Sequence, residues 1–132
     1  MRAAFAVLAS AEPGPGGRRL AVLGDMRELG ETAPALHAAL APSIAEAGVD
    51  LVLTCGPVMK ALHEALPRAR RGAYAADSQA IIPAVLAAVR PGDVILVKGS
   101  LGTRMAPIVE ALLRLDLAAE NGGTRARAAN GH

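Results

Sequence analysis

Short apolar runs alternate with amphipathic segments along this chain. Runs rich in Val, Leu, Ile and Ala predict four strands, at 19–23, 50–54, 72–76 and 94–97. Apolar residues at helical spacing predict helices at 2–11, 32–47, 57–66, 78–89 and 104–119. Strands that alternate with helices form a mostly parallel sheet with helices on both faces. The pattern therefore predicts an α/β fold, a single domain of three layers.

Proline and glycine mark the breaks in this pattern. The glycine- and proline-rich stretch 13–17 predicts a flexible loop. Thr32 is the expected N-cap of the second helix, and Pro42 is expected to kink or break that helix near 38–41. Residues 121–132 are small and polar, which predicts a disordered tail after a domain that covers 1–120.

Composition narrows the possible partners. The hydrophobic fraction is 52% but the aromatic fraction is only 2%, so Ala, Val, Leu and Ile must form the core. The net charge of +2 is not gathered into a basic stripe with aromatics, which argues against a nucleic-acid partner. No apolar run approaches the roughly 20 residues that span a bilayer. The lone Cys55 cannot form an internal disulfide, which favours a cytoplasmic location.

The first candidate site is the loop 24–30, which follows the first strand. Asp25 and Glu28 can accept hydrogen bonds from hydroxyl or ammonium groups, and Arg27 can bind a carboxylate or a phosphate. Ligands of open α/β sheets bind at the carboxyl ends of the strands, where this loop begins. A solvated loop before a helix explains the same residues equally well.

The second candidate site, 98–103, joins the most apolar strand to a helix. Lys98 is one of only two lysines, and the glycines after it expose backbone N–H groups beside a helix N-terminus, which favours an anion. A plain turn capped by Thr103 is the alternative. We favour a site because both loops should lie at one edge of the sheet. The two loops together indicate a crevice for a small anionic or zwitterionic ligand.

The histidines and the cysteine give weaker evidence for a functional site. His37 is expected on the surface or in the packing of its helix, and His63 is expected to be solvated. Cys55 is expected to be a small buried residue, because no histidine is placed beside it. No metal site, no catalytic acid–base pair and no G-x-x-x-x-G-K-[ST] phosphate loop is found in the sequence.

Four blocks, in order, carry a resemblance to a known family. They are L-G-D-M-R-E-L-G at 23–30 with His37 after it, V-D-L-V-L-T-C-G at 49–56, R-P-G-D-V at 90–94, and I-L-V-K-G-S-L-G-T-R-M at 95–105. Together they resemble the C-terminal domain of the Mur ligases, in the branch that adds D-Ala-D-Ala to a UDP-muramoyl-tripeptide. The resemblance extends over about residues 1–115 and implies a Rossmann-like domain.

The resemblance also implies a reaction and its partners. ATP, with Mg²⁺, phosphorylates the tripeptide carboxylate, and the amine of D-Ala-D-Ala attacks the acyl phosphate. The C-terminal domain closes over the nucleotide bound by a central domain, and an N-terminal domain binds UDP. Asp25 and Arg27 would contact the nucleotide on closure. Six residues would face D-Ala-D-Ala, namely Glu28, His37, Lys98, Gly99, Ser100 and Thr103.

Two departures bear on these implications. Leu101 stands where the family often has arginine, so one positive contact is missing. Without a phosphate loop and without the central and N-terminal domains, the chain is expected to bind no ATP or Mg²⁺ and to be inactive by itself. A stand-alone module that binds a small ligand or a protein, or a domain of another Mur or folylpolyglutamate-type ligase, is the alternative.

Overall fold

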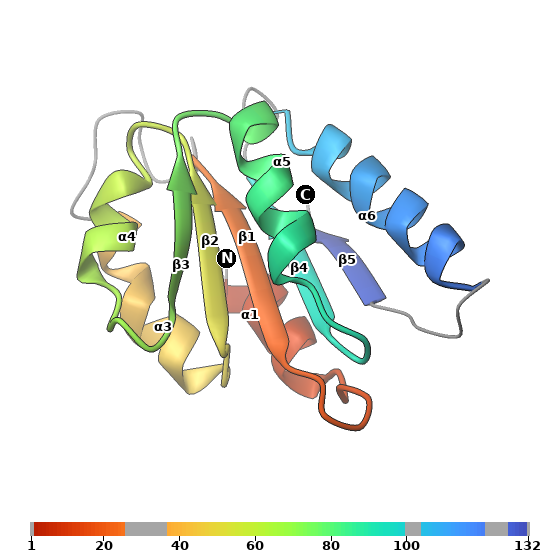
Figure 1. The fold of residues 1–132 in the computed structure, drawn as a ribbon. Coiled ribbons are helices and arrows are strands. Elements are labelled where there is room, and N and C mark those ends of the chain that lie inside the picture. The colour runs from red at the N-terminus through yellow and green to blue at the C-terminus, as the bar shows by residue number, and fades with distance from the viewer. Residues whose placement is uncertain (1, 26–36, 100–103, 121–126, 132) are drawn as a thin grey trace.

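The computed structural model describes residues 2–25, 37–99, 104–120 and 127–131. The elements alternate between helix and strand along the chain (Figure 1). In chain order they are α1 (Arg2–Ser10), β1 (Arg19–Gly24), α3 (Leu40–Glu46), β2 (Leu51–Cys55), α4 (Lys60–Ala65), β3 (Arg71–Ala75), α5 (Ser78–Ala88), β4 (Val94–Lys98), α6 (Ala106–Glu120) and β5 (Arg127–Gly131).

All strand pairs are parallel, and the sheet order is β3-β2-β1-β4-β5. The chain moves outward from β1 through β2 to β3, and then returns to the other side of β1 as β4. This reversal between β1 and β4 is the order of the Rossmann-like folds. The prediction of a mostly parallel α/β sheet is therefore confirmed.

Helices cover both faces of the sheet and bury two separate apolar clusters. On one face, Phe5 and Leu8 of α1, Ile44 of α3 and Leu62 of α4 pack against strand residues such as Ala21. On the other face, α5 and α6 pack against the alternate residues of the strands, through Ile81, Val85, Ile108 and Leu112. Figure 1 shows α5 and α6 in front of the sheet and α1 behind it. The three layers follow from strands that are apolar on both sides.

The helix before β2 is interrupted where the sequence predicted. Residues 37–38 are helical, Ala39 is a turn, and α3 begins at Leu40. Pro42 then lies in the first turn of α3, where its missing N–H needs no partner inside the helix. The expected N-cap Thr32 lies outside the described residues.

Two segments differ from the sequence-based expectation. The loop 13–17 was expected to be flexible, but Gly14 donates to the Gly92 carbonyl at 2.9 Å and a Cβ on Gly17 would collide with that same oxygen. Residues 127–131 were expected to be disordered, but they form β5, which pairs with the free edge of β4. A further strand satisfies backbone groups that an open sheet edge leaves unpaired. The domain boundary at 120 stays a prediction.

Candidate functional site

The carboxyl ends of β1 and β4 lie side by side at the point where the strand order reverses. Leu23 of β1 pairs with Lys98 of β4 on one side and with Thr54 of β2 on the other. Asp25 follows β1 directly, so it lies at the same edge as Lys98 (upper edge in Figure 1). The prediction that the two loops begin at one edge is confirmed. This reversal point is where open α/β sheets bind ligands.

Asp25 is engaged by the backbone of a neighbouring turn. Its Oδ1 accepts hydrogen bonds from the N–H of Val58 at 3.1 Å and of Met59 at 2.8 Å. These amides precede α4 and have no carbonyl partner within the helix. The carboxylate therefore caps the start of α4 from another strand, a contact that the sequence did not reveal.

Gly56 is the residue against which Asp25 rests. Gly56 is buried with a φ of +105°, and a Cβ there would lie 2.5 Å from the Asp25 Oδ1. Its N–H donates to Ala75 at 3.1 Å, and its carbonyl accepts from the Tyr74 hydroxyl at 2.9 Å. Desolvation, and then the charge of Asp25, raise the pKa of Tyr74. Gly56 and Tyr74 are site residues that the sequence analysis missed, although a G-P pair after a strand and the only tyrosine of the chain were visible signals.

Lys98 supplies positive charge at this edge. Lys98 and Gly99 are half-buried, and among the described residues Lys98 forms no ion pair. The Thr54 hydroxyl lies in the same row of the sheet and is fully buried, and within the described part of the chain it has no hydrogen-bond partner. An amine whose charge is not neutralised suits a carboxylate or phosphate oxygen.

The remaining predicted contacts divide into two groups. His37 is 1% exposed in the helical turn before α3, so it is a packing residue and not a surface one. Arg27, Glu28, Ser100 and Thr103 lie outside the described residues. Their predicted roles in nucleotide and dipeptide binding stay predictions.

Cys55 and His63 have different surroundings. Cys55 is buried as predicted, and desolvation, followed by the charges of Asp25 and Asp77, raises its pKa to about 12, so it is a poor nucleophile. His63 was predicted to be solvated, and the structure places it half-buried. Its ring lies 5.6 Å from that of Tyr74, and among the described residues its buried Nδ1 has no hydrogen-bond partner. Desolvation and Arg71 lower its pKa, against a smaller opposing effect of Glu64.

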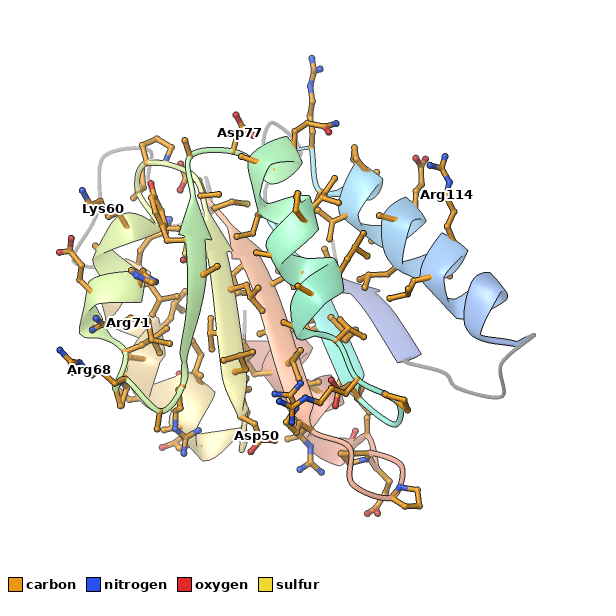
Figure 2. All side chains as sticks on the ribbon, in the orientation of Figure 1. Asp50, Lys60, Arg68, Arg71, Asp77 and Arg114 are labelled. Carbon is orange, nitrogen blue, oxygen red and sulfur yellow. The ribbon has the colours of Figure 1, made fainter. Side chains whose placement is uncertain are left out.

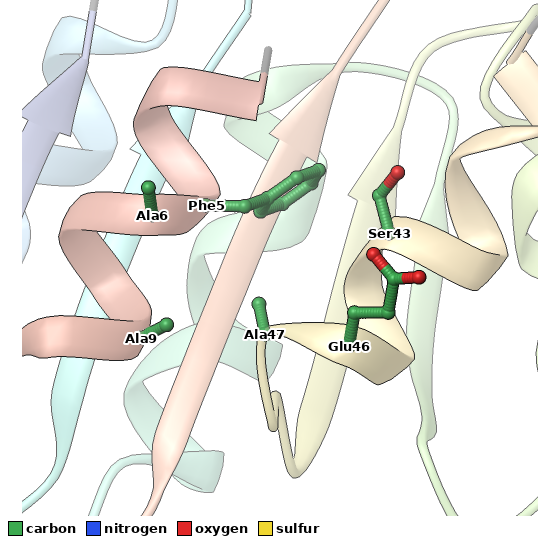
Figure 3. Close-up of a pocket in the computed structure, with 6 residues that line it drawn as sticks. All are labelled: Phe5, Ala6, Ala9, Ser43, Glu46 and Ala47. Atoms are coloured by element: carbon green, nitrogen blue, oxygen red, sulfur yellow. The ribbon is translucent and has the colours of Figure 1, made fainter.

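A groove also lies away from this edge, between two helices. A groove of about 390 Å³ lies between α1 and α3, with Phe5 and alanines on its walls and Ser43 and Glu46 at one side (Figure 3). Within the described part of the chain, no cluster of three or more His, Cys, Asp or Glu could hold a metal ion. No helix in that part is long and apolar enough to cross a membrane.

The parallel strands, the helices on both faces and the reversal of strand order between β1 and β4 define a Rossmann-like α/β domain. The model of the family described as "Mur ligase, glutamate ligase domain" matches residues 1–101, and the chain belongs to this family. The resemblance seen in the sequence is thereby confirmed.

Individual relatives agree with this assignment. The chain is 36% identical over 114 residues to the UDP-N-acetylmuramoyl-tripeptide–D-alanyl-D-alanine ligase of Escherichia coli, covering 85% of this chain and 24% of that protein. It is 31% identical over 101 residues to the ligase of the same name from Synechocystis, covering 75% and 22%. The structure of MurF ligase from Thermotoga maritima in complex with ADP superposes with a TM-score of 0.61 at 25% identity, covering 81% of this chain and 23% of that one. The chain thus spans about a quarter of the length of these relatives.

Proposed function

We propose that this chain is the substrate-closing domain of an ATP-dependent ligase that adds D-Ala-D-Ala to UDP-N-acetylmuramoyl-tripeptide in peptidoglycan synthesis. The carrying observation is the family match over residues 1–101, together with relatives whose names state that reaction. The ADP in the related Thermotoga maritima structure supports the use of ATP. Such an enzyme acts in the cytoplasm and needs no nucleic-acid or membrane partner.

The carboxyl ends of β1 and β4 fit one part of this chemistry. When an acyl phosphate is attacked by an amine, negative charge develops on the phosphate and carbonyl oxygens, and a fixed cation stabilises it. Lys98 offers that charge, and the Gly99 backbone continues the same edge. The carboxylate of the dipeptide is a second anion that Lys98 can bind.

Within this chain, the carboxyl end of β1 is a poor binding site for ATP and Mg²⁺. Asp25 is the carboxylate at the end of β1, and its Oδ1 is already occupied by two backbone amides. Mg²⁺ prefers carboxylates together with phosphate oxygens. In this proposal the metal and most nucleotide contacts belong to other parts of the enzyme, and Arg27, Glu28, His37, Ser100 and Thr103 remain predicted contacts.

A second candidate is a ligase of the same family that adds another amino acid. The family description names a glutamate ligase domain. The two candidates differ in the amine that attacks the acyl phosphate. Both require a nucleotide-binding domain outside this sequence.

A chimera tests the proposal directly. The whole chain, residues 1–132, would replace the matching C-terminal segment of the Escherichia coli relative, so that β5 is kept. Phosphate release would be measured with D-Ala-D-Ala, glutamate or no amine. We expect release that depends on D-Ala-D-Ala. Release only with glutamate would favour the second candidate, and a folded chimera without amine-dependent release would contradict both.

The two lysines provide a matched pair of variants. Lys98→Met should lower kcat/KM by about tenfold or more, since a charge-assisted contact is lost. Lys60→Met removes an exposed lysine at the start of α4 and should leave kcat/KM within about twofold. Equal effects of the two substitutions would remove Lys98 from the proposed site.

A further inference from the structure

We propose that Asp25 is a positioning residue, whose carboxylate holds the turn 56–59 against the end of β1, with Gly56 and Tyr74 completing the contact. The role in catalysis rests on the proposed function, whereas the contact itself does not. This assignment replaces the expectation that Asp25 contacts the nucleotide.

The hydrogen bonds of Asp25 are directed at the protein itself. One oxygen accepts from both Val58 and Met59, at 3.1 and 2.8 Å, although these residues are 33 and 34 positions away in sequence. The N-cap residue of α4, Met59, has no side-chain oxygen to bind these amides. A carboxylate at this position also matches the positive end of the peptide dipoles.

The turn is shaped to receive this carboxylate. A Cβ at position 56 would approach both Oδ1 and Cγ of Asp25, at 2.5 and 2.6 Å, so only glycine leaves room. The φ of +105° independently requires glycine. The Tyr74 hydroxyl then fixes the Gly56 carbonyl at 2.9 Å, which links the ends of β1, β2 and β3.

This arrangement has a consequence for Lys98. Asp25 and Lys98 lie at the same edge, because Leu23 and Lys98 are paired in the sheet. The carboxylate binds amides on the β2 side and forms no ion pair with Lys98 on the β4 side. Holding Asp25 in this way leaves the amine of Lys98 to an anionic ligand.

The contact is tested first by NMR on the ligand-free chain. The amide protons of Val58 and Met59 should move upfield together in Asp25→Asn, because a neutral acceptor binds them less strongly than a carboxylate does. Asp77→Asn is the matched control, since Asp77 accepts from Ala80 at the start of α5. Unchanged resonances of Val58 and Met59 in Asp25→Asn, or an equal shift in Asp77→Asn, would overturn the proposal.

The second test asks whether an uncharged acceptor oxygen at position 25 is sufficient to hold the turn 56–59. Asparagine keeps an acceptor oxygen but no charge, so hydrogen exchange at Val58 and Met59 should accelerate about tenfold or more in Asp25→Ala and much less in Asp25→Asn. Gly56→Ala should destabilise the wild-type protein more than it destabilises the Asp25→Ala variant. The strain at the positive φ is present in both proteins, but the collision of the new Cβ with the carboxylate occurs only when Asp25 is present. Additive effects, or equal exchange in both Asp25 variants, would overturn the proposal.

The chimera then separates positioning from ligand contact and from a merely structural role. At a temperature where circular dichroism shows every variant folded, Asp25→Ala should lower kcat/KM by about tenfold, and Asp25→Asn should restore it to within about threefold of wild type. Loss in both variants would indicate a charged ligand contact, and loss in neither would indicate a structural role; both overturn the positioning role. If the unsubstituted chimera is inactive, the proposed function fails, and the NMR and exchange results alone decide whether Asp25 holds the turn.

Discussion

The two edges of the sheet use charged residues in opposite ways. At the amino edge, Asp93 is fully buried and accepts from the Arg18 and Arg90 backbone N–H groups at 2.9 and 2.8 Å, and from the Arg18 guanidinium at 3.0 Å. At the carboxyl edge, Lys98 forms no ion pair with the described residues. Figure 2 shows Asp50 at the amino edge and Asp77 at the opposite one. One edge is therefore built for stability, and the other keeps a charge available.

Arginines extend the contrast at the amino edge. Arg19 donates to the Leu8 and Ala11 carbonyls at the end of α1, and Arg18 donates to Ala88 at the end of α5. Arg71 donates to Glu64 and Leu66 at the end of α4. Cations at helix C-termini satisfy unpaired carbonyls and match the dipole. The carboxyl edge has the complementary device, since Asp25 and Asp77 bind amides at helix starts.

The largest effect on stability is expected from removing Asp93. Asp93→Ala removes the ion-pair partner of Arg18 and the acceptor of the Arg18 and Arg90 backbone N–H groups. It should lower the free energy of unfolding by about 3 kcal/mol or more. Urea denaturation followed by circular dichroism measures this. Asp50→Ala is the control, because exposed Asp50 accepts one hydrogen bond from the Arg19 N–H, at 2.9 Å, and should cost about 1 kcal/mol or less. Similar losses in both variants would show that burial of Asp93 is unimportant.

Gly17→Ala tests how tightly the loop 13–17 is bound at the amino edge. The added Cβ would collide with the Gly92 backbone, so we expect a loss of about 2 kcal/mol. Gly16→Ala is the matched variant in the same loop. Its Cβ meets nothing within 4 Å, but its φ of +73° costs about 1 kcal/mol. The melting temperature of Gly17→Ala should therefore be lower than that of Gly16→Ala. The reverse order would mean that the loop is not packed as described.

The stability of the protein at alkaline pH should reveal the burial of the Cys55 thiol at the carboxyl edge. Burial raises the pKa of the Cys55 thiol from 9.0 to about 12, so above about pH 9 the unfolded chain loses this proton while the folded chain keeps it. Stability is then lost as pH rises, by about 1.4 kcal/mol per unit at most. The difference in unfolding free energy between wild type and Cys55→Ala should shrink between about pH 8 and 10. A constant difference across this range would contradict a buried thiol.

The smallest effect on stability is expected at Lys98. Because Lys98 has no ion-pair partner among the described residues, Lys98→Met should change the free energy of unfolding by less than about 0.5 kcal/mol. The same variant should lose activity in the chimera. A large loss of stability would mean that Lys98 holds the fold together, and the contrast between the two edges would disappear.

Local patterns predicted most of the fold. The four apolar runs became β1 to β4, and the break near Ala39 followed from Pro42. Asp77 accepts from the Ala80 N–H, three residues further on, and so caps α5. These features depend on residues a few positions apart, where spacing alone carries the information. Strand β5 was missed because its residues, R-A-A-N-G, show no apolar alternation.

Contacts between distant residues could not be predicted in this way. The sequence placed Asp25 and Lys98 at one edge, because parallel strands all end there. It gave no sign that Asp25 would bind amides more than 30 positions away, or that Arg18 would meet Asp93 across 75 positions. Such pairings depend on strand order, which the pattern of apolar residues leaves open. The partial cover of His63 by Tyr74 was missed for the same reason, because Tyr74 comes from another element.

The arginines that bind helix ends change how the isoelectric point should be understood. A calculated value of about 9.2 invites the idea that polyanions or acidic surfaces attract this protein. Arg18, Arg19 and Arg71 instead have their guanidinium hydrogens directed at the protein's own carbonyls. A purification or formulation scientist who lowers the isoelectric point by replacing arginines should therefore spare these three. Lysine at those positions would preserve the charge but lose the planar group that binds two acceptors at once. Arg19 and Arg71 each bind two carbonyls, and Arg18 binds the Ala88 carbonyl and the Asp93 carboxylate.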